Sequence, residues 1–189
     1  MTTFKLSSLA QAVAICVGAV LFAGSAVAAD TKGDKATYEQ AKASAKAAYD
    51  TDKKACDSLS GNAKDICVAE AKAKKTRVEE NAEAAYKNTP KAREHAVHEI
   101  AEADYEVAKE RCDDKAGNDK DVCVKEAKAA MTKVQADAKA AQKGTEARMD
   151  ANQDKRDADY KVAIEKCDAF AGPAKDACIG NAKMQYGKS

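Results

Sequence analysis

The stretch Cys112-Asp-Asp-Lys-Ala-Gly-Asn-Asp-Lys-Asp-Val-Cys123 places a glycine between two cysteines that are separated by ten residues. The same pattern occurs three times in the chain, and a tyrosine stands seven residues before each pair. The copies comprise Tyr49, Cys56, Gly61 and Cys67; Tyr105, Cys112, Gly117 and Cys123; and Tyr160, Cys167, Gly172 and Cys178. Self-similarity at a period of about 55 residues indicates a protein built from repeated structural units.

Each copy predicts two helices joined by a tight turn. In the middle copy, apolar residues fall at spacings of three and four, which places them on one stripe of a helix. These residues are Val97, Ala101, Tyr105, Ala108 and Cys112. We expect Gly117 to end this helix in a left-handed conformation and Asn118 to cap the next one. The first copy repeats this order with Gly61 and Asn62, whereas Pro173 suits the opening of a helix in the third.

The composition favours helices and leaves little for a conventional core. Alanine, lysine and glutamate are strong helix formers, and the chain holds only two prolines. Beyond residue 29, large apolar side chains are scarce, with one leucine (Leu59) and one phenylalanine (Phe170). The predicted fold is therefore all-α: three disulfide-stapled helical hairpins that form an elongated bundle or coiled coil of long antiparallel helices.

Six of the seven cysteines form the three matched pairs. Both cysteines of a pair lie about one and a half turns from the bend, and Ala-rich helices approach closely enough for a disulfide to close between them. Each closed loop would add roughly 2–3 kcal/mol of stability. Pairing between repeats is one alternative, because six cysteines allow fifteen connectivities, and a zinc site is another. The predicted disulfides are Cys56–Cys67, Cys112–Cys123 and Cys167–Cys178.

Two breaks separate the hairpins. Asn88-Thr89-Pro90 carries strong stop and start signals for helices, whereas Gly144 is a weaker break. If the chain reverses at both, six arms form an up-down bundle. If it runs through both, two long helices cover about 62–115 and 118–170, and this is the arrangement that we favour. The repeats are expected to form one elongated domain with hairpins over 30–88, 89–144 and 145–189.

Residues 1–29 are typical of a cleaved signal peptide. Lys5 precedes an uncharged apolar stretch over 9–22, and small residues over 26–29 suit cleavage after Ala28 or Ala29. An uncleaved membrane anchor is the alternative. The segment holds one basic and no acidic residue, so the remaining chain is neutral. Such a balance argues against nucleic acid as a partner and against a polybasic membrane-binding surface. We expect no stable membrane insertion after the signal peptide is cleaved.

The repeat Tyr105 to Cys123 and the ending Ala182-Lys-Met-Gln-Tyr-Gly-Lys-Ser189 resemble a group of exported Gram-negative proteins. These are small Ala/Lys-rich helical proteins that are loosely labelled TolA-like, and the resemblance covers essentially the whole chain after residue 29. TolA-type proteins share a long periplasmic helix, but they keep a membrane anchor and a separate C-terminal domain, neither of which we expect here. The resemblance implies a periplasmic location and brings no activity.

The two histidines suggest a metal site. His95, His98, Glu99 and Glu102 lie three or four residues apart on a predicted helix, so they could share one face. Imidazole and carboxylate groups together suit Zn²⁺, Ni²⁺ or Cu²⁺. A solvated polar helix face is the alternative, in which the protein holds no cofactor.

The sequence contains no pattern of residues that indicates catalysis. The serines have no partners that suggest a triad, the cysteines are expected to be oxidised, and no glycine-rich phosphate loop is present. We therefore expect a non-catalytic periplasmic repeat protein that acts as a structural, scaffold or chaperone-like component of the cell envelope. Its partner would be an envelope protein or a second copy of itself. The alternative is a periplasmic metal- or cation-binding protein that uses His95 and His98.

Overall fold

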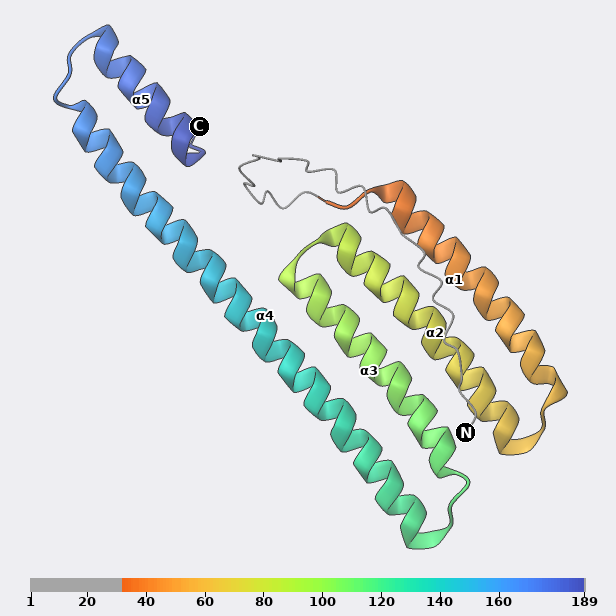
Figure 1. Ribbon diagram of the computed structural model, residues 1–189. Helices are drawn as coiled ribbons and strands as arrows, with labels where there is room; N and C mark the ends of the chain where they lie inside the picture. The colour runs from red at the N-terminus through yellow and green to blue at the C-terminus, as the bar shows by residue number, and fades with distance from the viewer. Residues whose placement is uncertain (1–31, 189) are drawn as a thin grey trace, which may run out of the picture.

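The computed structural model describes residues 32–188, and every element in this range is helical (Figure 1). The elements are α1 (Lys35–Ala55), a short 3₁₀ helix (Cys56–Ser58), α2 (Gly61–Lys87), α3 (Pro90–Cys112), α4 (Gly117–Cys167) and α5 (Pro173–Tyr186). The all-α prediction is confirmed. The signal peptide predicted for residues 1–29 lies outside the described residues.

The helices form an elongated layer. Figure 1 shows α1, α2, α3 and the first half of α4 side by side, each antiparallel to the next. The second half of α4 continues past the end of α3, and α5 folds back along it. Within residues 32–188, α4 packs against α3 and α5 alone. Half of the longest helix therefore projects from the layer with one short partner.

The chain reverses at Pro90. Asn88 ends α2 in a left-handed conformation (φ 48°), and the Thr89 hydroxyl accepts a hydrogen bond of 3.1 Å from the Ala92 amide. Pro90 then opens α3. The expected continuous helix over 62–115 is therefore wrong. Proline has no amide hydrogen and its ring clashes with the preceding turn, so the helix ends before it.

The chain runs straight through Gly144. This glycine lies inside α4, a helix of 51 residues that is about 76 Å long at 1.5 Å per residue. The predicted long helix over 118–170 is confirmed. A glycine keeps its amide hydrogen and costs a helix only about 1 kcal/mol relative to alanine. As a result, one helix supplies the second arm of the middle hairpin and the first arm of the last.

The three predicted disulfides are confirmed. They join Cys56 to Cys67, Cys112 to Cys123, and Cys167 to Cys178, and the two Cα atoms lie 5.7 Å apart in each. The first cysteine of every pair is among the most buried side chains of the described residues, and most of the other buried residues are alanines. Each disulfide thus takes the central position that a leucine cluster holds in a conventional core.

The turn glycines are left-handed as expected, but they stand at the start of the second helix. In the middle hairpin, α3 ends at Cys112 and Gly117 (φ +55°) is the first residue of α4. The last turn before the bend tightens, since the Asp113 amide bonds the Glu110 carbonyl oxygen three residues earlier. The expectation that Gly117 ends α3 and Asn118 caps α4 is therefore wrong. Pro173 does open α5, as predicted.

An ion pair crosses each of the three disulfide-linked turns, and the sequence analysis missed it. An aspartate follows the first cysteine of each pair, and a lysine stands three residues before the second. Their carboxylate and ammonium groups lie 2.7–3.0 Å apart, although exposed pairs of this kind contribute little individually. The recurrence of both residues in all three copies is the signal that could have revealed it. The pairs are Asp57–Lys64, Asp113–Lys120 and Asp168–Lys175.

Polar contacts also hold the first hairpin against the second. They run between α2 and α3, the two helices that meet at the Pro90 bend. Two are ion pairs of 2.6 Å and one is a hydrogen bond of 3.0 Å from a side-chain amide to a main-chain carbonyl oxygen. They join Arg77 to Asp104, Glu70 to Arg111, and Asn62 to Glu110.

Candidate functional site

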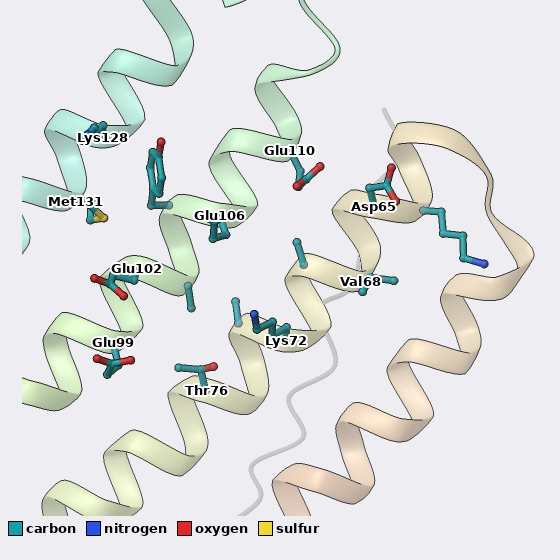
Figure 2. A pocket seen from close by; sticks show the side chains of 15 residues that line it. Asp65, Val68, Lys72, Thr76, Glu99, Glu102, Glu106, Glu110, Lys128 and Met131 are labelled. Carbon is teal, nitrogen blue, oxygen red and sulfur yellow. The ribbon is translucent and has the colours of Figure 1, made fainter.

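A wide groove of about 890 Å³, lined by charged and apolar side chains, crosses α2, α3 and α4 (Figure 2). Four glutamates of α3 line it, and lysines enter from both neighbouring helices, Lys72 from α2 and Lys128 from α4. The groove is open to solvent along its length. Its lining of mixed charge suits a polar or charged surface better than a small apolar ligand. The glutamates are Glu99, Glu102, Glu106 and Glu110.

A second, apolar groove of about 250 Å³ lies between α3 and α4. Val97 and Ile100 of α3 line it together with Met131 and Val134 of α4. Val97 is 37% exposed and Val134 is 46% exposed, so the apolar edges reach solvent. A groove with apolar walls and an open mouth can receive the apolar side chain of another protein segment.

The structure brings together three of the four predicted metal ligands. His98, Glu99 and Glu102 of α3 each offer one ligand atom, and these atoms lie within 4.8 Å of one another. The Nδ1 atom of His98 is 3.5 Å from a carboxylate oxygen of Glu102. All three side chains are partly exposed, so a bound cation would retain water among its ligands.

His95 is not one of these three ligands: its Nδ1 atom lies 3.9 Å from a carboxylate oxygen of Glu99, and it is also close to Glu80 and Glu83 of α2. Burial raises the pKa of Glu80, with a further contribution from Glu83. A hydrogen bond from Lys87 lowers the pKa of Glu83. The helix spacing alone did not distinguish the two histidines, because it ignores the neighbouring helix.

The tyrosines pack between helices. Tyr105 lines the apolar groove, and the ring of Tyr160 lies 6.1 Å from that of Tyr186 on α5. A contact that the sequence analysis missed is the stack of Tyr38 on Tyr86, with ring centroids 5.1 Å apart. Aromatic pairs at these separations stabilise helix packing by about 0.5–1.5 kcal/mol beyond their buried area.

All six cysteines within residues 32–188 are in disulfides, so this part of the chain offers no thiolate for nucleophilic or redox chemistry. In the same range, none of the helices combines the length and apolar character needed to cross a membrane. Comparisons with family models, curated proteins and solved structures give no match for this chain. The two grooves, the disulfides and the His98 group are the features on which function can be argued.

Proposed function

We propose that this chain is a non-catalytic periplasmic protein that acts by surface contact, as a structural, scaffold or chaperone-like component of the cell envelope. The observation that carries the proposal is the oxidised state of all six described cysteines, each pair joining two helices. Disulfides persist in oxidising compartments such as the periplasm and are rare in the cytosol. The predicted signal peptide and the resemblance to exported Ala/Lys-rich proteins support the same location.

The apolar groove between α3 and α4 supports a role in contact with other proteins. Val97 and Val134 are partly exposed although they stand beside Met131 and Ile100 in an apolar setting. Covering such a surface with another apolar side chain is worth roughly 25 cal/mol per Å² of area removed from water. A scaffold or chaperone-like protein would use this surface to hold a segment of its partner.

Site-specific photocrosslinking in intact cells tests this proposal. A photoreactive amino acid at Val134 would lie in the groove, whereas one at Val78 on α2 would lie outside it with similar exposure, 44% against 46%. We expect a reproducible adduct with an envelope protein from position 134 and none from position 78. Fractionation should recover the chain in the periplasm. Recovery in the cytosol with reduced cysteines would contradict the proposal.

A second candidate function is cation binding, which the His98 group favours because its three ligand atoms converge within 4.8 Å. Titration calorimetry with ZnCl₂ tests it. We expect His98→Ala to abolish the binding heat and His95→Ala to preserve it, since His95 lies outside the group. Absence of binding by the unaltered protein, or equal loss in both variants, would dismiss this candidate.

A further inference from the structure

The repeat relates the contact between α2 and α3 to residues of α4. The first cysteines of the pairs, Cys56, Cys112 and Cys167, show that residue n of the first repeat corresponds to n + 56 in the second. They also show that residue n of the second repeat corresponds to n + 55 in the third. By these shifts α2 corresponds to the first half of α4, and α3 corresponds to its second half. The residues that form the α2–α3 contact therefore have equivalents in the two halves of the single helix α4.

The charged residues of the α2–α3 contact have equivalents in α4 that carry the same sign of charge. Between α2 and α3, Arg77 pairs with Asp104 and Glu70 pairs with Arg111, each at 2.6 Å. The counterparts of the first pair are a lysine and an aspartate, and those of the second are a glutamate and a lysine. The counterparts are Lys133 with Asp159, and Glu126 with Lys166.

These counterparts cannot meet within one copy of the chain. At 1.5 Å per residue, Lys133 and Asp159 lie about 39 Å apart along α4, and Glu126 and Lys166 lie about 60 Å apart. All four side chains are exposed, and none forms an ion pair with any residue of the described range. Helix α4 therefore carries two pairs of oppositely charged residues that do not meet, whereas their equivalents in α2 and α3 form ion pairs.

The apolar residues of the α2–α3 contact also have equivalents of the same type in α4. Ala73 lies one turn from Arg77, and Val107 lies one turn from Asp104, so these residues share the contact face. Four small apolar residues of α2 and α3 are buried, namely Ala73, Ala84, Ala96 and Val107. Their counterparts keep the residue type but are exposed, Val162 by 54%. The counterparts are Ala129, Ala140, Ala151 and Val162.

One face of α4 is open along its whole length. Figure 1 shows α3 beside the first half of α4 and α5 beside the second half, both on the same side of the helix. Residues Glu126, Lys133 and Ala140 fall seven apart, so they form one stripe along α4, and all three are exposed. The repeated charges and alanines thus lie on the face that no described element covers.

We propose that a second copy of this chain packs antiparallel on this face of α4. Both charged pairs have the same midpoint in the sequence, Glu146, so a two-fold axis near this residue brings Lys133 onto Asp159 of the second copy. The same axis brings Glu126 onto Lys166, and symmetry makes each pair twice. The single register that satisfies both pairs also places Ala140 opposite Ala151, as Ala84 lies relative to Ala96.

The dimer reproduces between two chains the packing that the Pro90 bend produces within one. The first repeat reverses at Asn88-Thr89-Pro90, whereas the matching residues 144–146 continue the helix. The repeated residues and the exposed face of α4 support this interface whatever the location of the protein, so it does not depend on the proposed envelope role. A monomeric protein would overturn it and leave the crosslinking test at Val134 unaffected.

Light scattering after gel filtration and oxidative crosslinking test this interface together. We expect the chain over residues 30–189 to elute as a dimer at tens of micromolar. In Ala147→Cys the two added thiols would lie beside the two-fold axis and form a disulfide-linked dimer. In Ala129→Cys, on the same face, the two thiols would lie about 50 Å apart and stay unlinked. A monomer in solution, or crosslinking from both positions or from position 129 alone, would overturn the proposal.

Charge reversal checks the register. We expect Lys133→Glu to raise the dimer Kd about tenfold, since it replaces two attractive pairs with two repulsive ones. Adding Asp159→Lys should restore the original Kd. Lys54→Glu is the matched control, because this exposed lysine of α1 makes the same charge change far from α4. Equal weakening by Lys54→Glu, or failure of the second substitution to restore the dimer, would also overturn the proposed pairing.

Discussion

The side-chain amide of Asn62 donates a hydrogen bond of 3.0 Å to the main-chain carbonyl oxygen of Glu110, which links the turn of the first hairpin to the end of α3. The same amide group lies 2.6 Å from a carboxylate oxygen of Asp114. Asn62 follows the turn glycine, where a capping role was expected, yet it bridges two repeats instead. This residue therefore helps to set how the hairpins stack.

Replacing Asn62 by alanine should lower the free energy of unfolding by about 1 kcal/mol, because both hydrogen bonds are lost and the Glu110 carbonyl loses a partner. Urea unfolding followed by circular dichroism measures this. Asn81→Ala is the matched control, since this exposed residue of α2 makes no comparable contact and alanine is the better helix former by about 0.5 kcal/mol. Equal effects of the two substitutions would show that the bridge contributes nothing.

Gly144→Ala should stabilise the protein by about 1 kcal/mol. The glycine is helical, and a Cβ atom added there meets nothing within 4 Å. Alanine therefore gains helix propensity without a clash. The melting temperature measures the effect. A decrease would indicate that the chain bends at this residue in solution, as a six-arm bundle requires.

Gly33→Ala makes the same chemical change with the opposite expected sign. Its Cβ atom would lie 2.8 Å from the Ala85 carbonyl oxygen and 2.9 Å from the Tyr86 Cα atom, both parts of the main chain. The hydrogen bond from the Gly33 amide to the Tyr86 carbonyl oxygen (2.8 Å) would be strained. We expect a loss of about 1–3 kcal/mol, typical of overpacking. Faster hydrogen exchange at the start of α1 would locate the effect, and unchanged exchange there would refute it.

Acid should release the end of α5 through Asp157. Hydrogen bonding to Lys188 (2.7 Å) holds the pKa of this carboxyl below its ordinary value of 3.8. A lowered carboxyl pKa contributes stability that is complete above the ordinary pKa and is lost as the pH falls through the folded-state pKa. We expect hydrogen exchange at 183–187 to rise below about pH 4. In Asp157→Asn, this exchange should already be fast at neutral pH and lack the acid step.

Local signals in the sequence predicted the hairpins well. The cysteine spacing, the turn glycine and the scarcity of leucine together indicate short helical arms joined near a bend, and the structure has them. Pro173 and Thr89 were readable as helix starts because their effects act within one turn. Such features depend only on residues that are close in the sequence, so one amino-acid sequence is enough to predict them.

The sequence pattern did not predict the features that depend on contacts with other helices. Pro90 and Gly144 both looked like breaks, but only a residue without an amide hydrogen forces the reversal, so the favoured continuation through Pro90 was wrong. Asn62 was expected to cap its own helix, whereas its actual partner lies in another repeat. His95 and His98 share a helix face, yet α2 lies beside one of them. The outcomes for Asn62 and His95 depend on the register between helices, which periodicity within one helix does not carry, whereas the reversal at Pro90 follows from the local chemistry of proline.

Three local disulfides hold the hairpins together, and non-reducing peptide mapping tests them most directly. After blocking of free thiols, trypsin cuts between the cysteines of every pair, so each disulfide joins two short peptides. We predict linked peptides covering 55–64 with 65–72, 112–115 with 121–125, and 167–175 with 176–183. A dominant linkage between peptides of different repeats, or free thiols in the purified native protein, would contradict the stapled-hairpin fold.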